Sequence, residues 1–341
     1  MKKSLITLGV LALFVLMAYG QEKKFALYSV AFYNMENLFD TIHDEGKNDY
    51  EYLPNGTNQW NTMKYKAKLK NMSEILSLLS TDKLPMGPAI IGVSEIENYR
   101  VLEDILKQPA LADRGYQYVH YEGEDQRGVD CAFFYNPKLF ELTNSKLVPY
   151  VYINDTIHKT RGFLIASGNI AGEKMHFIVN HWPSRAAASP ARERAGEQVR
   201  AIKDSLLRED SAAKIVIMGD MNDDPMDKSM AVALGAKRKP ADVGPTDLYN
   251  PWWDTLKKGY GTLMYKGKWN LFDQIVFTGN LLGTDRSTLK FYKHEIFRRD
   301  FMFQKEGKYK GYPKRTQAGG VWLNGYSDHL PTIIYLIKEM K

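Results

Sequence analysis

Cysteine is almost absent from this chain, because Cys131 is the only one among 341 residues. One cysteine cannot form an intramolecular disulfide, so the fold is not a disulfide-stabilised one. A zinc site built from several cysteines is excluded for the same reason. Cys131 lies in the strand-like run 129–135, where we expect a buried, inert thiol rather than a nucleophile.

Internal repeats and linkers rich in proline, glycine or serine are also absent, and no long stretch lacks apolar residues. The chain is 44% hydrophobic and 25% charged, which is an ordinary globular composition. We therefore expect one folded domain over residues 21–341, without a long disordered segment.

An apolar stretch long enough to be a targeting segment occurs at the N-terminus. Two lysines precede the almost wholly apolar residues 5–19, and Ala18 and Gly20 place small residues two positions apart. This pattern is typical of a secretory signal peptide, while the stretch is short for an uncleaved membrane anchor. We therefore expect cleavage of residues 1–20, and an exported protein, periplasmic or extracellular, that starts near Gln21 without a stable membrane anchor.

Charge of one sign is not strongly in excess. Removal of residues 1–20 takes away two lysines and no acid, which leaves 44 basic against 40 acidic residues and a net charge of +4. This mild basic excess suits a polyanionic substrate without requiring one.

Predicted strands outnumber predicted helices. Amphipathic helices are expected at 60–79 and 190–208, far apart in the chain. Sheets covered by a few helices fit this pattern better than strict alternation of strand and helix. Expected strands include 25–33, 89–93, 146–153, 162–170, 174–179, 215–218, 269–278 and 332–337.

The stretch 215–225 has the most specific pattern. An apolar β-branched run ends at Gly219, and Asp220 and Asn222 follow one residue apart. The pattern predicts a buried strand whose polar side chains emerge at its carboxyl end, where α/β sheets bind ligands. A capped turn is an equally good interpretation of this stretch alone.

Similar polar groups follow other predicted strands. Asp273, in contrast, is expected inside an apolar strand, where a carboxylate needs a partner. An oxygen-rich site with two imidazoles and no cysteine favours Mg²⁺ or Mn²⁺, with the histidines as general acid and base. Such a site suits hydrolysis of a phosphate ester. The five groups at predicted strand ends are Asn34/Glu36, Glu95/Glu97, Asn180/His181, Asp220/Asn222 and Asp328/His329.

These motifs, in this order, resemble the endonuclease/exonuclease/phosphatase superfamily. Its pattern is an early Asn, a Glu after the second strand, a His motif, Gly-Asp-x-Asn, a late Asp and a terminal Ser-Asp-His, and it covers nearly the whole chain after residue 20. The resemblance implies a DNase I-like, four-layer α/β sandwich of two packed mixed β-sheets flanked by helices. The runs 127–130 and 180–185, with Gly261-Thr262, are similar to those of a branch of secreted bacterial nucleases.

The resemblance also implies roles for single residues. Glu95 would be the main metal ligand, with Asn34 beside it and Asp328 as a further ligand. Asp220 would orient or deprotonate the attacking water, and Asn222 would hold a phosphate oxygen. The acid/base pair would be His329, oriented by Asp273, and His181, oriented by Asp130. The candidate phosphate-binding side chains are Arg127, Arg161 and Arg185.

Several alternatives stay open. A single arginine can equally be a solvated surface residue, and Glu36 and Glu97 can be supporting groups, extra ligands or plain surface acids. We expect a monomeric, secreted phosphodiesterase that acts on DNA or RNA, since residues 298–315 interleave basic and aromatic side chains. The alternatives are a phosphatase or phospholipase C-like enzyme acting on inositol phosphates or sphingomyelin-type lipids, and a non-catalytic binding protein on the same fold.

Overall fold

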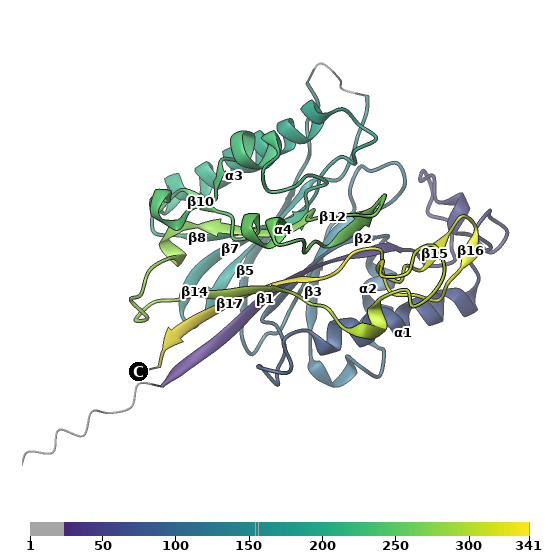
Figure 1. The fold of residues 1–341 in the computed structure, drawn as a ribbon, viewed down its shortest axis with the longest axis horizontal. Coiled ribbons are helices and arrows are strands. Elements are labelled where there is room, and N and C mark those ends of the chain that lie inside the picture. The colour runs from purple at the N-terminus through teal and green to yellow at the C-terminus, as the bar shows by residue number, and fades with distance from the viewer. Residues whose placement is uncertain (1–23, 154, 156, 341) are drawn as a thin grey trace, which may run out of the picture.

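Two mixed β-sheets form the centre of the molecule in a computed structural model (Figure 1). The structure describes residues 24–153, 155 and 157–340, so the expected signal peptide lies outside the described residues. The six-stranded sheet has the order β14 (Lys290–Ile296), β17 (Thr332–Glu339), β1 (Phe25–Leu38), β2 (Ile90–Ile96), β4 (Asp130–Tyr135) and β3 (Gln117–His120). The seven-stranded sheet has the order β5 (Glu141–Val148), β6 (Phe163–Ile170), β7 (Glu173–His181), β8 (Lys214–Asp220), β13 (Asp273–Thr278), β10 (Leu248–Tyr249) and β9 (Ala236–Lys237).

Helices cover the outer faces of the sheets, and two small hairpins lie outside them. The α-helices are α1 (Thr62–Leu78), α2 (Tyr99–Leu106), α3 (Ser189–Glu209) and α4 (Trp253–Lys257), and a π-helical turn spans Ser229–Leu234. The hairpins pair β11 (Leu263–Tyr265) with β12 (Lys268–Asn270) and β15 (Gln317–Ala318) with β16 (Val321–Trp322). Short 3-10 turns occur at Tyr50–Tyr52, Ala112–Arg114, Pro240–Asp242, Gly279–Leu281 and Asp300–Met302. None of the described helices is long and apolar enough to cross a membrane.

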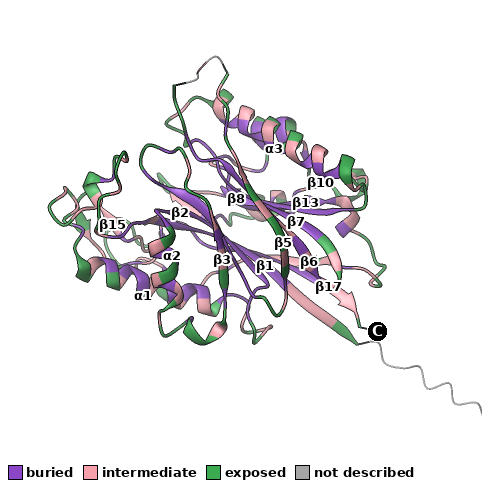
Figure 2. Ribbon diagram, turned by 180° about the vertical axis from the view of Figure 1, so that it is seen from behind, coloured by how far each residue is buried: buried purple, intermediate pink, exposed green. Residues whose placement is uncertain are grey.

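Side chains that alternate between the two faces of each strand build the layers of the fold. In β1, Val30 and Phe32 belong to the core between the sheets, while Ala31 and Tyr33 belong to the core beneath α1 and α2. Successive strand side chains point to opposite faces, so a strand with apolar residues at every position is buried on both sides. Figure 2 shows the strands as the buried centre, with α3 exposed on its outer side. The expected four-layer α/β sandwich is confirmed.

The boundaries of several elements differ from the sequence prediction. Helix α1 begins at Thr62 because the side chain of Asn61 caps it and accepts a hydrogen bond from the Lys64 backbone N–H. The bounds of the strand expected at 146–153 are wrong, because β5 spans Glu141–Val148. Polar residues dominate the first half of β5, and none of the residues of this edge strand is buried, so its sequence lacks an apolar signal.

Chain direction brings the polar groups to one edge of both sheets. Strand β1 runs parallel to β2, and β7 runs parallel to β8, so their carboxyl ends coincide in pairs. Strand β13 is antiparallel to β8 and pairs Asp273 with Asp220, so its first residue lies at this edge. Gly219 permits the close approach of β7, because a Cβ there would lie 2.4 Å from the Asn180 carbonyl oxygen.

Candidate active site

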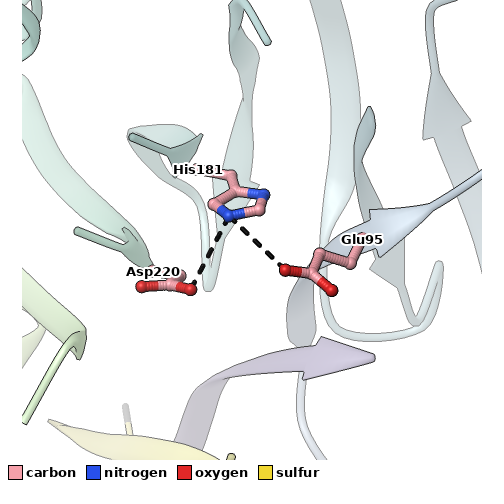
Figure 3. Close-up of side chains that lie close together, drawn as sticks. All are labelled: Glu95, His181 and Asp220. Carbon is pink, nitrogen blue, oxygen red and sulfur yellow. Dashed lines mark ion pairs between the residues drawn. The ribbon is translucent and has the colours of Figure 1, made fainter. Parts of the chain in front are cut away.

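Residues from both sheets meet at this shared edge. Glu95 comes from the end of β2 in the first sheet, and His181 and Asp220 are the last residues of β7 and β8 in the second. Figure 3 shows the imidazole of His181 between the two carboxylates. Its Nε2 lies 3.6 Å from Glu95 Oε1 and 3.7 Å from Asp220 Oδ2. The two sheets therefore share one polar centre.

Asn34 links the carboxylates of this centre. Its amide nitrogen donates to Asp220 Oδ2 at 3.0 Å and to Glu95 Oε1 at 3.3 Å. The amide oxygen accepts the backbone N–H of Glu36 at 2.8 Å. Glu95 also accepts the backbone N–H of Asn37 at 3.0 Å. With its nitrogen toward the carboxylates, Asn34 positions them and does not present its oxygen to the centre as a metal ligand would.

His329 and Asp273 form a buried pair on the other side of Asp220. His329 Nδ1 lies 2.7 Å from Asp273 Oδ2, and His329 Nε2 lies 3.8 Å from Asp220 Oδ2. The hydroxyl of Ser327 donates to the Asn34 carbonyl and accepts the backbone N–H of His329. The structure thus brings His329 and Asp273 together as the sequence predicted. Asp273 lies in a strand as expected, but as the first residue of β13, because the chain makes no strand pairing at Leu271 and Phe272.

Burial and neighbouring charges give the titratable groups different protonation states. Burial, with the charges of Asp273 and Glu95, raises the pKa of Asp220 to about 7. Burial and the nearby cations Arg161 and Arg127 hold the pKa of His181 well below its usual range, so this imidazole is neutral. Burial opposes a charge on His329, yet Asp273 and Asp220 raise its pKa well above the ordinary value. One neutral and one protonated imidazole therefore flank Asp220.

The donor set fits a divalent cation. Glu95, His181 and Asp220 each offer a ligand atom, and these atoms lie within 4.8 Å of one another. A buried carboxylate whose pKa is raised by its neighbours is also a position where a cation would stabilise the ionised form. Asp328 lies at the edge of this centre, with its Oδ1 3.9 Å from His329 Nε2.

A model of the endonuclease/exonuclease/phosphatase family matches residues 29–338. The chain belongs to this family. No curated protein matches it. The family's activity, hydrolysis of phosphate esters, agrees with a centre of carboxylates and histidines.

Solved structures of the same fold are similar to this chain. A Bacteroides thetaiotaomicron protein of the family is 15% identical, covering 93% of this chain and 97% of that one, with a TM-score of 0.58. The D. rerio protein TDP2 complexed with a single-strand DNA product is 15% identical, covering 91% and 99%, with a TM-score of 0.53. The B. thetaiotaomicron mannosyl-6-phosphatase Bt3783 is 14% identical, covering 91% and 99%, with a TM-score of 0.56. At these identities the likeness establishes the fold.

The structure does not show the expected pairing of Asp130 with His181. Asp130 Oδ2 instead lies 3.2 Å from His120 Nε2 and accepts the Gly123 backbone N–H at 3.0 Å. His181 Nδ1 is buried without a hydrogen-bond partner. The expectation failed because the carboxylate of Asp130 contacts His120, which lies on β3 beside β4.

The three arginines differ in what they can do. Arg161 is buried and bound to Asp125 and to the Trp182 carbonyl, both at 2.9 Å, so its guanidinium is committed to protein groups. Arg127 is half-exposed, 3.7 Å from Asp125. Arg185 contacts three aspartates of the loop after β8 and stacks over Phe272. The geometry favours Arg127 as a phosphate contact over Arg161.

Asn222 and Glu97 occupy defined positions near the centre. Asn222 adopts a left-handed backbone conformation, with a φ of 51°, and its amide donates to the Trp182 carbonyl while its backbone N–H donates to Asp220. Glu97 is buried and accepts the Asp40 backbone N–H, and burial raises its pKa to about 9. Glu97 therefore supports the loop after β1 rather than lying on the surface.

A buried network behind the centre was not predicted. Glu36 accepts hydrogen bonds from Arg315 Nε at 2.9 Å and from the Thr316 backbone N–H at 2.7 Å, and Arg315 Nη2 lies 3.0 Å from Asp328 Oδ2. Lys68 of α1 lies 3.9 Å from Glu36. The residues next to Glu36 in the sequence do not predict these partners, because Arg315 and Thr316 lie far along the chain.

Proposed function

We propose that this protein is an exported, Mg²⁺- or Mn²⁺-dependent phosphodiesterase that cleaves nucleic acid. The observation that carries the proposal is the position of Asp220 between a neutral imidazole, His181, and a protonated one, His329. A general base near neutral pH and a cationic hydrogen-bond donor in one centre are what phosphoester hydrolysis requires.

Each residue has a defined task in this proposal. With a pKa raised to about 7 by burial, Asp220 can accept a proton from the attacking water near neutral pH. The imidazolium of His329, held by Asp273, stabilises the charge that develops on the phosphate oxygens and can donate a proton to the leaving oxygen. Asn222 binds a phosphate oxygen through its amide. Neutral His181 can accept a hydrogen bond at a ring nitrogen, but its pKa, held well below the usual range by burial, makes it a weaker base than Asp220.

Glu95 would hold the cation, with Asp220 and Asp328 close by and Asn34 fixing the two carboxylates of Glu95 and Asp220. When bound, a divalent cation supplies positive charge that stabilises the transition state of phosphoester hydrolysis. In this proposal, Arg127 and Arg185 also contact the substrate phosphate.

The solved structures of the same fold support two substrate classes. One was determined with a single-strand DNA product. Another is described as a mannosyl-6-phosphatase, which supports a phosphomonoesterase as the second candidate. The basic and aromatic segment 298–315 favours the first class.

An activity panel separates the two candidates. We expect the purified protein to hydrolyse bis(4-nitrophenyl) phosphate and oligonucleotides when Mg²⁺ or Mn²⁺ is present, because the carboxylates of Glu95 and Asp220 need a cation between them and the substrate. EDTA should abolish hydrolysis, and excess Mg²⁺ should restore it. The panel also contains mannose 6-phosphate, an inositol phosphate and sphingomyelin vesicles. If the protein hydrolysed any of these faster than both bis(4-nitrophenyl) phosphate and the oligonucleotides, the nuclease proposal would be wrong.

Export is tested on the chain itself. When the full chain is expressed in a Gram-negative bacterium, we expect the mature protein outside the cytoplasm, with Gln21 as its first residue. Mass spectrometry of the purified protein measures this directly. Recovery of a cytoplasmic protein that retains residues 1–20 would contradict the proposal, and membrane retention of the uncleaved chain would indicate an anchor.

A further inference from the structure

A cavity of about 1010 Å³ adjoins the active site. Three segments form its walls, which are residues 51–60, 263–266 and 304–323. At its inner end it is lined by Asn37, whose backbone N–H holds Glu95, and by Asp328, next to His329. Figure 1 shows the β15–β16 hairpin beside the segment that follows β1. The cavity therefore reaches the centre described above without containing its catalytic side chains.

Contacts between the three segments hold the cavity open. The Tyr312 hydroxyl accepts the Gly267 backbone N–H at 2.6 Å, which joins the third segment to the β11–β12 hairpin. Trp60 of the first segment meets Trp322 of the third edge to face, with ring centroids 5.8 Å apart. These contacts therefore link all three walls of the cavity to one another.

The walls carry exposed tyrosines and cations. Tyr265 and Tyr309 line the cavity with 61% and 51% of their surface exposed. A lysine ammonium lies over each ring, Lys266 at 5.3 Å and Lys308 at 5.6 Å from the ring centroid. Exposed aromatic rings next to cations are what bind stacked bases together with phosphates.

The third segment also has a strong charge bias. Residues 304–315 contain five lysines and arginines and one acid, Glu306. At the inner end, Glu36 and Asp328 are both paired with Arg315, at 2.9 and 3.0 Å, so this arginine is committed to the two carboxylates. The cations that line the cavity are therefore Lys266 and Lys308, beside the two tyrosines, and Arg315 at the inner end, while the acids are Glu36, Glu51, Glu306 and Asp328. The positive charge that can meet a phosphate lies at the two tyrosines.

We infer that this cavity binds the unpaired nucleotides that flank the scissile phosphate, with bases stacked on Tyr265 and Tyr309. The inference rests on the proposed function. The volume is far larger than one phosphorylated monosaccharide needs, and paired lysines on exposed rings do not suit the acyl chains of a lipid. Bases of a duplex are stacked on one another, so only a single strand presents them to the tyrosines.

Binding tests the inference without catalysis. In EDTA, fluorescence anisotropy measures the Kd of a fluorescein-labelled oligothymidylate of about 8 nucleotides, at one fixed salt concentration. We expect Tyr265→Ala and Tyr309→Ala each to raise the Kd about 10-fold. Tyr292→Ala is the matched control, because Tyr292 is 52% exposed on β14 and does not line the cavity. It should leave the Kd unchanged.

Other results overturn the inference. Unchanged Kd values for both tyrosine variants would place the strand elsewhere, as would tighter binding of the duplex form than of the single strand. Displacement of the oligothymidylate by mannose 6-phosphate, or stronger retention on sphingomyelin vesicles, would assign the cavity to another ligand. If the wild-type protein bound no oligothymidylate, the inference would be wrong.

Hydrolysis then separates failure of this inference from failure of the proposed function. Both tyrosine variants should lower kcat/KM for the oligonucleotide at least about 10-fold more than for bis(4-nitrophenyl) phosphate, mainly through KM. Equal losses on both substrates would indicate damage to the active site and overturn the inference. A wild-type protein that binds the strand but cleaves no phosphodiester would contradict the proposed function while the cavity assignment stands.

Discussion

Asp220→Asn should lower kcat for phosphodiester hydrolysis about 1000-fold. The carboxylate lies 3.7 Å from His181 Nε2 and 3.8 Å from His329 Nε2. Its raised pKa of about 7 makes it a stronger base than neutral His181, while His329 already carries its proton. An amide of the same shape can occupy the position but cannot accept a proton from water. Initial rates on bis(4-nitrophenyl) phosphate, at saturating Mg²⁺, measure the loss.

The folded state should tolerate this substitution. The buried charge of Asp220 is repelled by Asp273 and Glu95, so a neutral side chain removes an unfavourable interaction. It also loses the attraction to the His329 cation and one of the two hydrogen bonds that the carboxylate accepts, from Asn34 and from the Asn222 backbone N–H, because an amide has only one acceptor oxygen. The two effects oppose each other, so we expect the free energy of unfolding of the metal-free protein to change by no more than about 1 kcal/mol.

A stability measurement and a control variant test this prediction. Urea denaturation compares the stability of the variant with that of the wild-type protein, and Asp204→Asn, on the exposed side of α3, is the control for loss of one carboxylate. The control should keep full activity. A well-folded Asp220→Asn variant with wild-type kcat would show that another group activates the water.

Side chains that follow a buried strand could be predicted from the sequence, because chain direction alone places them. Asp220 ends an apolar run, and the register of β8 with β7 and β13 brings His181 and Asp273 beside it. The pairing of His329 with Asp273 followed from the family pattern. In these cases the strand order decides which residues meet.

Contacts made through loops could not be predicted in the same way. The family pattern pairs Asp130 with His181, yet His120 at the end of β3 and Gly123 in the loop between β3 and β4 contact its carboxylate instead. Lys68 is a lysine on an amphipathic helix, for which exposure is the ordinary expectation. Its partners Thr316 and Tyr326 lie about 250 positions away in the sequence, and no local pattern carries that information.

Lys68→Met should lower the free energy of unfolding by about 3 kcal/mol, the size typical of breaking a buried ion pair. Lys68 is fully buried, and its ammonium donates to Thr316 Oγ1 at 2.5 Å and to the Tyr326 carbonyl at 2.6 Å. Methionine fills a similar volume but removes a donor from both acceptors, leaves the Tyr326 carbonyl with only the Thr316 hydroxyl at 3.2 Å, and leaves Glu36 with less compensation. Urea denaturation followed by circular dichroism measures the loss.

The matched control and a double variant show whether the network is the cause. Lys66→Met changes an exposed lysine of the same helix and should shift the free energy of unfolding by less than about 0.5 kcal/mol. Adding Glu36→Gln to Lys68→Met should cost less than the sum of the single losses, because the second change removes the uncompensated charge. Strict additivity would mean that Lys68 and Glu36 act independently. Coupling would show that Lys68 of α1 stabilises the charge of Glu36. Glu36 in turn holds Arg315 and Thr316 in the cavity wall, and Arg315 holds Asp328 at the edge of the active site.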